Sequence, residues 1–94
     1  MIGQINGKVI EKKDNLLLID VGGICYEVFI PQMILNRIEQ FIDCDKKIKL
    51  ITYHYHQVEP SKSIPILIGF LNEIEKEFFE KFITVSGIGP KAAL

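Results

Sequence analysis

The strongest constraint on the fold is a pair of apolar runs, Leu16–Val21 and Ile24–Ile30, separated only by Gly22 and Gly23. In the second run a set of large apolar residues (Ile24, Tyr26, Val28 and Ile30) alternates with Cys25, Glu27 and Phe29, which is the two-residue period of a pleated strand. Two glycines between such runs favour a tight hairpin turn. The stretch Ile2–Glu11 is also rich in β-branched residues. The pattern therefore predicts a meander of three antiparallel strands.

The pattern changes at Pro31, which ends the third strand and suits the first turn of a helix. Four apolar residues then share one helical face, and they predict a single short helix: Ile34, Leu35, Ile38 and Phe41. Strand character returns over Lys47–His56 and Ile64–Phe70, with a loop predicted at Gln57–Ser63. Three strands, a helix and two strands favour a small barrel of the oligonucleotide/oligosaccharide-binding (OB) type. The order of elements leaves an SH3-like barrel or a plain meander open.

The segment from Leu71 to Val85 contains neither glycine nor proline. Its apolar residues recur at steps of three and four, which predicts an amphipathic helix with Asn72 or the turn before it as the N-terminal cap. The residues expected on the buried face are Leu71, Ile74, Phe78, Phe82 and Val85. We place a domain boundary near residue 70, with a barrel over residues 1–70 and a second, incomplete domain over residues 71–94.

The stretch Gly87–Ala92 (Gly-Ile-Gly-Pro-Lys-Ala) resembles a turn between two helices. The glycines permit tight backbone angles, Ile88 can fill the angle between the helices, and Pro90 suits the first turn of the next helix. Backbone N–H groups at such a turn can donate to a phosphate oxygen, and Lys91 adds a positive charge. This is the chemistry of a helix-hairpin-helix, which binds the DNA backbone without reading bases. An ordinary connector between helices, with no ligand, is the alternative.

Other candidate chemistry is weaker. On a strand His54 and His56 point to the same side, but no third ligand has suitable spacing, so we expect no metal site. Carboxylates and serines form no recognisable catalytic arrangement, and the sequence predicts neither an enzyme nor a cofactor. Cys25 and Cys44 lack metal-type spacing and are interpreted as reduced thiols. The absence of a signal-like or membrane-spanning segment favours a cytoplasmic location.

Taken together, the motifs resemble the RuvA family over essentially all 94 residues. The matching segments, in order, are Met1-Ile2-Gly3, Ile19–Val28, Pro31, Thr52–Tyr55, Gly69-Phe70, Phe78-Phe79 and Val85–Lys91. The resemblance implies an OB barrel followed by a domain with two helix-hairpin-helix motifs and a small C-terminal domain. It also implies a DNA-junction-binding subunit that holds Holliday junctions open as a homotetramer during recombination and repair.

The resemblance further implies partners and site residues. The partners would be four-way junction DNA, the ATPase RuvB (through the C-terminal domain) and the resolvase RuvC. The phosphate-binding residues of the first hairpin would be Gly87, Ile88, Gly89, Pro90, Lys91 and Ala92. We expect the chain to be a piece of a longer protein, cut within that hairpin. In the family an acidic pin lies between the last two barrel strands, but here the matching loop has one carboxylate, Glu59, and Lys62 nearly cancels its charge.

Two further functions remain open at this stage. The chain could act as an assembly scaffold that binds DNA poorly, or as a single-strand binder that stacks bases on Tyr53, Tyr55 or Phe29. The net charge of the chain is −1, and residues 1–70 carry eight basic and eight acidic residues. That balance disfavours a single-strand groove, which basic side chains would line.

Overall fold

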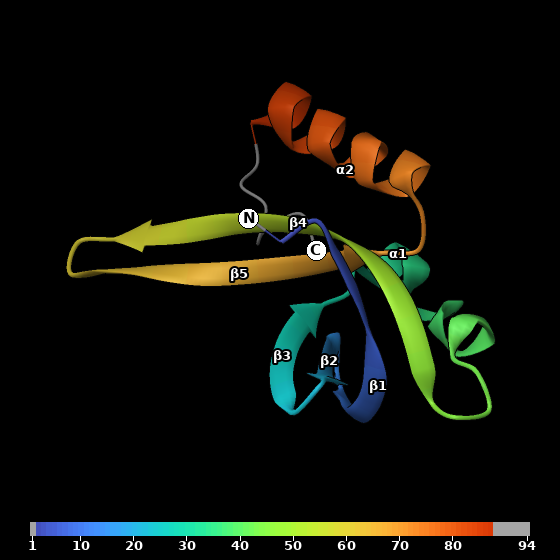
Figure 1. Ribbon diagram of the computed structural model, residues 1–94. Coiled ribbons are helices and arrows are strands. Elements are labelled where there is room, and N and C mark those ends of the chain that lie inside the picture. The colour runs from blue at the N-terminus through green and yellow to red at the C-terminus, as the bar shows by residue number, and fades with distance from the viewer. Residues whose placement is uncertain (1, 88–94) are drawn as a thin grey trace.

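The computed structural model describes residues 2–87 of the chain, except for the side chain of Glu59 (Figure 1). Its elements, in chain order, are β1 (Gln4–Lys13), β2 (Leu16–Val21), β3 (Ile24–Phe29), α1 (Gln32–Leu35), the 3-10 turn η1 (Ile38–Phe41), β4 (Lys47–Glu59), β5 (Lys62–Phe70) and α2 (Glu73–Ser86). The strands form a barrel, and α2 lies across one side of it, over β4 and β5 (Figure 1).

The five strands close into a barrel in the order β1-β2-β3-β5-β4. β3 pairs in parallel with β5, through Val28 opposite Leu67 and Phe29 opposite Ile68, whereas all the other pairs are antiparallel. A plain meander would place β3 beside β4, so this order excludes it. A five-stranded barrel with such a crossover is the OB fold, and the predicted fold class is confirmed.

The predicted hairpin between the second and third strands is also confirmed. β2 and β3 pair from Leu16 opposite Phe29 to Val21 opposite Ile24, which leaves only Gly22 and Gly23 in the turn. Their φ angles are +60° and +97°, a backbone region that glycine enters without steric cost. The Asp20 carboxylate accepts a hydrogen bond of 2.9 Å from the Gly23 N–H and stabilises the turn.

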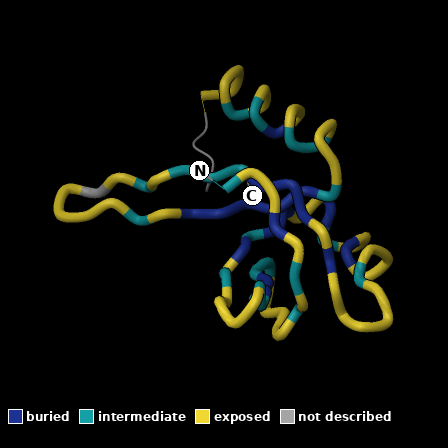
Figure 2. Tube along the Cα trace, in the orientation of Figure 1, coloured by how far each residue is buried: buried dark blue, intermediate teal, exposed yellow. Residues whose placement is uncertain are grey.

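The core lies inside the barrel, and the buried segments of the strands gather there (Figure 2). The buried apolar side chains are Ile5, Leu17, Ile19, Val28, Ile30, Ile34, Ile38, Ile48, Leu50, Ile51, Ile66, Leu67, Ile68, Phe70 and Phe79. Thr52 is the buried polar side chain found among the described residues, and its hydroxyl donates to the Ile2 carbonyl at 2.6 Å. That bond satisfies a polar group that would otherwise be costly to bury. Within the described part of the chain, no helix is long and apolar enough to cross a membrane.

The single helix predicted after Pro31 is wrong. The structure has two short turns instead, because α1 ends at Leu35 and a turn at Asn36 and Arg37 separates it from η1. Ile34 and Ile38 are buried as expected, but Phe41 is half exposed. Since η1 does not continue the axis of α1, the apolar stripe that an unbroken helix would carry stops before it reaches Phe41.

Candidate nucleic-acid interface

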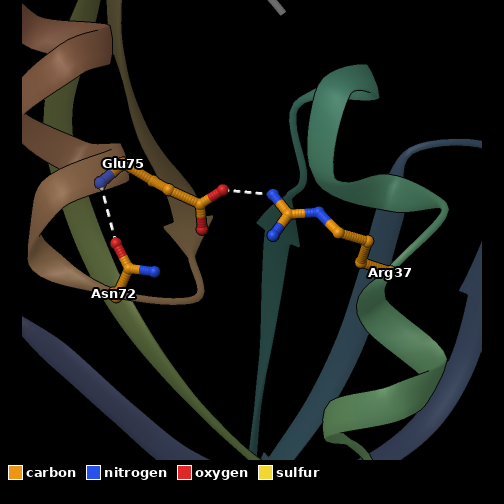
Figure 3. A network of polar contacts seen from close by, with 3 residues as sticks. All are labelled: Arg37, Asn72 and Glu75. Carbon is orange, nitrogen blue, oxygen red and sulfur yellow. Dashed lines mark hydrogen bonds and ion pairs between the residues drawn. The ribbon is translucent and has the colours of Figure 1, made fainter.

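The element that leads into the predicted hairpin is α2, which runs from Glu73 to Ser86 rather than from Leu71 to Val85. Asn72 is its N-terminal cap, as predicted, because its side-chain oxygen accepts from the Glu75 N–H at 2.9 Å. The Glu75 carboxylate also forms an ion pair with Arg37, next to η1 (Figure 3). The start of α2 is thereby tied to the segment that follows α1.

The buried face of α2 was predicted wrongly. Phe79 is only 3% exposed, and its ring packs against Phe70 and Tyr53, with centroids 5.2 and 6.1 Å apart. Ile83, one turn later, packs against the same core. The stripe expected to be buried is exposed instead, with Ile74 at 77%, Phe78 at 57%, Phe82 at 43% and Val85 at 87%.

This error has a physical reason. Phe79 and Ile83 form a second apolar stripe, four residues apart, beside the stripe of Phe78 and Phe82. The periodicity of apolar residues identifies a helix but does not say which of two stripes faces the core. In the structure a shallow apolar groove lined by Phe78, Phe82 and Val85 therefore faces away from the barrel.

The hairpin residues begin where α2 ends. Gly87 follows the helix with φ +74° and ψ +8°, a left-handed C-terminal cap that glycine favours. The other predicted phosphate-binding residues, Ile88, Gly89, Pro90, Lys91 and Ala92, lie outside the described residues. Their contact with phosphate stays a prediction, based on sequence alone.

The loop predicted at Gln57–Ser63 is wrong, because β4 and β5 continue through it. Their last paired residues are Glu59 and Lys62, so only Pro60 and Ser61 form the turn. The paired strands project from the barrel as a long hairpin (Figure 1), and its outer half is largely exposed (Figure 2). Pairing of the strands satisfies the backbone groups of a segment that would be unpaired in a loop. The alternation of side chains in the sequence breaks at His56-Gln57, so it did not predict the continuation of β4.

Glu59, the predicted pin carboxylate, ends β4 at the tip of this hairpin. The Cα of Lys62 is its partner across the pair, and the neighbouring Val58 side chain is 80% exposed. Glu59 and Lys62 carry opposite formal charges, so this pair adds no net charge to the sequence of the tip. A role for Glu59 near DNA stays a prediction.

The two histidines lie on one side of β4, as their spacing predicted. Their ring centroids are 5.3 Å apart, and Nδ1 of His56 lies 3.2 Å from the Ser63 hydroxyl. A structural zinc site takes four ligands and a catalytic one at least three protein ligands. Within residues 2–87 we find no group of three His, Cys, Asp or Glu residues that could hold a metal ion.

The opposite side of β4 carries Tyr53 and Tyr55, with ring centroids 5.9 Å apart. Tyr53 is partly buried against Phe79, so its ring serves the packing of α2. The Tyr55 hydroxyl is buried and has no hydrogen-bond partner among the described residues. Burial, together with the neighbouring Tyr53, raises the pKa of the Tyr55 phenol. Aromatic rings that are engaged in packing are poor platforms for stacking bases. This disfavours the alternative function of a single-strand DNA binder.

Known proteins place the chain in one family. The family model described as the RuvA N terminal domain matches residues 1–59. Three relatives, each named Holliday junction branch migration complex subunit RuvA, match essentially the whole chain. They come from Desulfosudis oleivorans (37% identical over 94 residues), Syntrophus aciditrophicus (40% over 94) and Oceanobacillus iheyensis (41% over 95). The resemblance inferred from the sequence motifs is confirmed.

The chain is shorter than these relatives. It spans 44% of the length of the Desulfosudis protein and 43% of each of the other two. The family model that matches residues 1–59 describes an N-terminal domain.

Proposed function

Because the chain belongs to the RuvA family, we propose that it is the N-terminal, non-catalytic part of a subunit that binds four-way DNA junctions. Binding uses contacts to the sugar-phosphate backbone and the shape of the junction rather than base sequence. The observation that carries this proposal is the similarity of the whole chain to subunits named for the Holliday junction branch migration complex. ATP hydrolysis then belongs to a RuvB partner.

Two features of the structure support this assignment. α2 ends in a left-handed glycine at the first residue of the Gly-Ile-Gly-Pro-Lys stretch, as a helix does when it enters a tight hairpin. The β4–β5 hairpin extends away from the barrel and carries Glu59 at its tip (Figure 1). A hairpin that projects in this way can reach between the arms of an open junction.

The exposed apolar stripe of α2 supports the proposed domain organisation, in which residues 71–94 begin a helix-hairpin-helix domain. A helix with apolar residues on two sides packs on two sides. Phe79 and Ile83 pack on the barrel, and Phe78 with Phe82 is left for the remainder of that domain or for a neighbouring subunit. Homotetramer assembly and contact with RuvC complete the proposal.

A second candidate function is favoured by the same stripe. Contiguous exposed apolar side chains mark interaction surfaces, so the chain could serve as an assembly scaffold with little affinity for DNA. The two candidates differ in what they predict for DNA binding and for molecular mass in solution.

The test measures binding of a labelled four-way junction by the chain and by its Lys91→Gln variant. If Lys91 contacts a phosphate, the variant binds more weakly, and the slope of log affinity against log salt falls by about one. Lys76→Gln, which removes an equal charge from α2, should change neither value. If the chain binds no junction but sediments as an oligomer, the result would favour the scaffold function and contradict the proposal.

A further inference from the structure

A groove on the outside of the barrel, where β1, β2 and β4 meet, is lined by three lysines: Lys8, Lys47 and Lys49. Lys8 on β1 lies directly opposite Lys47 on β4, and Asn6 lies opposite Lys49. The core residues Ile5, Ile48 and Leu50 occupy the alternate positions of the same strands. Since successive side chains on a strand point to opposite faces, the lysines are directed outward into the groove.

Lys8 has a charged residue directly opposite it on each neighbouring strand, Asp20 on β2 and Lys47 on β4. Like charges directly opposite each other on paired strands destabilise a sheet. Among the described residues, none of the three lysines has an ion pair within 4.0 Å; the pairs found are Lys12–Glu39 and Arg37–Glu75. Asp20 therefore offsets part of the charge of Lys8, whereas Lys47 and Lys49 have no carboxylate directly opposite them in the described strand pairing.

Two carboxylates also line the groove, but backbone groups already engage both. Asp20 accepts from the Gly23 N–H, and Asp43 accepts from the N–H groups of Asp45 and Lys47, each at 2.9 Å. Three lysines and two aspartates leave a formal charge of +1 in the groove, whereas the whole chain carries −1. The positive charge is thus local.

We propose that this groove binds phosphate groups of a nucleic-acid backbone, as a contact separate from the helix-hairpin-helix. Lysine ammonium groups are common phosphate ligands and act as point charges. The groove lies at the start of β4, whereas the Pro60–Ser61 turn follows the end of the same strand. DNA as the source of the phosphates rests on the proposed function, but the affinity of the groove for phosphate does not.

The first test uses the triple variant Lys8→Gln, Lys47→Gln, Lys49→Gln. Binding to a labelled DNA duplex should weaken at least tenfold at low salt, and the slope of log affinity against log salt should fall by about 2 to 3. The matched control is Lys12→Gln, Lys13→Gln, Lys76→Gln, which removes the same charge outside the groove. Equal losses in the two triple variants would overturn the proposal, because only total charge would then matter.

The second test needs neither a variant nor DNA. Inorganic phosphate is added to the isotopically labelled chain, against sodium chloride at equal ionic strength, and amide NMR shifts are followed. Saturable shifts at Lys8, Gly22 and Lys47 that chloride does not produce would support the groove, and their absence would overturn it. If the unaltered chain binds no DNA, the proposed function fails, and this titration alone decides the groove.

Discussion

Gly69 shows how closely single residues are fitted in this barrel. A Cβ added to Gly69 would lie 2.9 Å from Val28 Cγ1, 3.0 Å from Leu50 Cδ1 and 3.2 Å from Ile30 Cδ1. All three neighbours are fully buried core side chains, so they have little room to move. The requirement at this position is space, since its backbone does not have a positive φ.

The substitution Gly69→Ala should therefore lower the free energy of unfolding by about 1–3 kcal/mol, the usual cost of overpacking a core. Urea denaturation measures the change. Gly3→Ala is the matched control, because a Cβ at Gly3 would meet no atom within 4 Å. Equal stability of the two variants would contradict this packing.

The buried hydroxyl of Tyr55 leads to a prediction about pH. Its pKa is raised by burial and by Tyr53, so between the unfolded and folded pKa values the folded state holds a proton that the unfolded state has lost. The stability of the chain should therefore fall as the pH rises through and above about 10. Tyr55→Phe removes this group and, at neutral pH, a buried hydroxyl that has no hydrogen-bond partner within residues 2–87.

The measurement compares urea denaturation of the chain and of Tyr55→Phe from pH 7 to pH 11. The variant should be at least as stable at pH 7 and should lose less stability at high pH. Parallel curves would show that Tyr55 does not titrate differently in the two states.

For α2, the sequence predicts the position of the helix, but only the structure shows which of its faces packs on the barrel. The absence of glycine and proline and the Asn72 cap are local signals, and they predicted the helix to within two residues at its start and one at its end. Its rotation about its own axis depends on the aromatic pocket formed by Phe70 and Tyr53, which lie on other elements. Local periodicity contains no information about that pocket.

Adjacent phenylalanines test this rotation directly. Phe79→Ala should cost about 3–5 kcal/mol of unfolding free energy, because it leaves a cavity in the core. Phe78→Ala, the same change one residue earlier, should cost less than about 1 kcal/mol, since Phe78 is more than half exposed. Urea denaturation measures both, and a larger loss for Phe78→Ala would mean that the other stripe faces the barrel.

The strands show the same division between local and distant signals. The Gly22–Gly23 turn and the alternation before Pro31 act between neighbours in the chain, and the structure has that hairpin. The parallel pairing of β3 with β5 joins Val28 to Leu67, 39 positions apart. The number and sequence of predicted elements therefore favoured an OB fold, but they did not determine the order of strands in the barrel. The length of the β4–β5 hairpin was not predicted, because Pro60 and the nearby serines are residues typical of loops. In the structure Ser63 and Pro65 are nevertheless part of the paired strand β5.

At the scale of the whole molecule, several features bear on the proposed binding of DNA. The barrel places α2 over β4 and β5, and α2 carries the chain to Gly87 and the predicted hairpin (Figure 1). The β4–β5 hairpin projects from the barrel, and the lysine groove lies at the start of β4. The candidate site could be predicted only in part, because Gly87–Ala92 is a local motif whereas the groove is assembled from three strands.

The central claim, that the chain recognises the shape of a four-way junction, is tested most directly by competition. The chain is bound to a labelled junction at moderate salt, and unlabelled junction or linear duplex of the same arm sequence is added. We predict that the junction displaces the label at concentrations at least tenfold lower than the duplex, with both affinities falling as salt rises. Equal displacement by the two DNAs would contradict the claim and leave only attraction to the backbone.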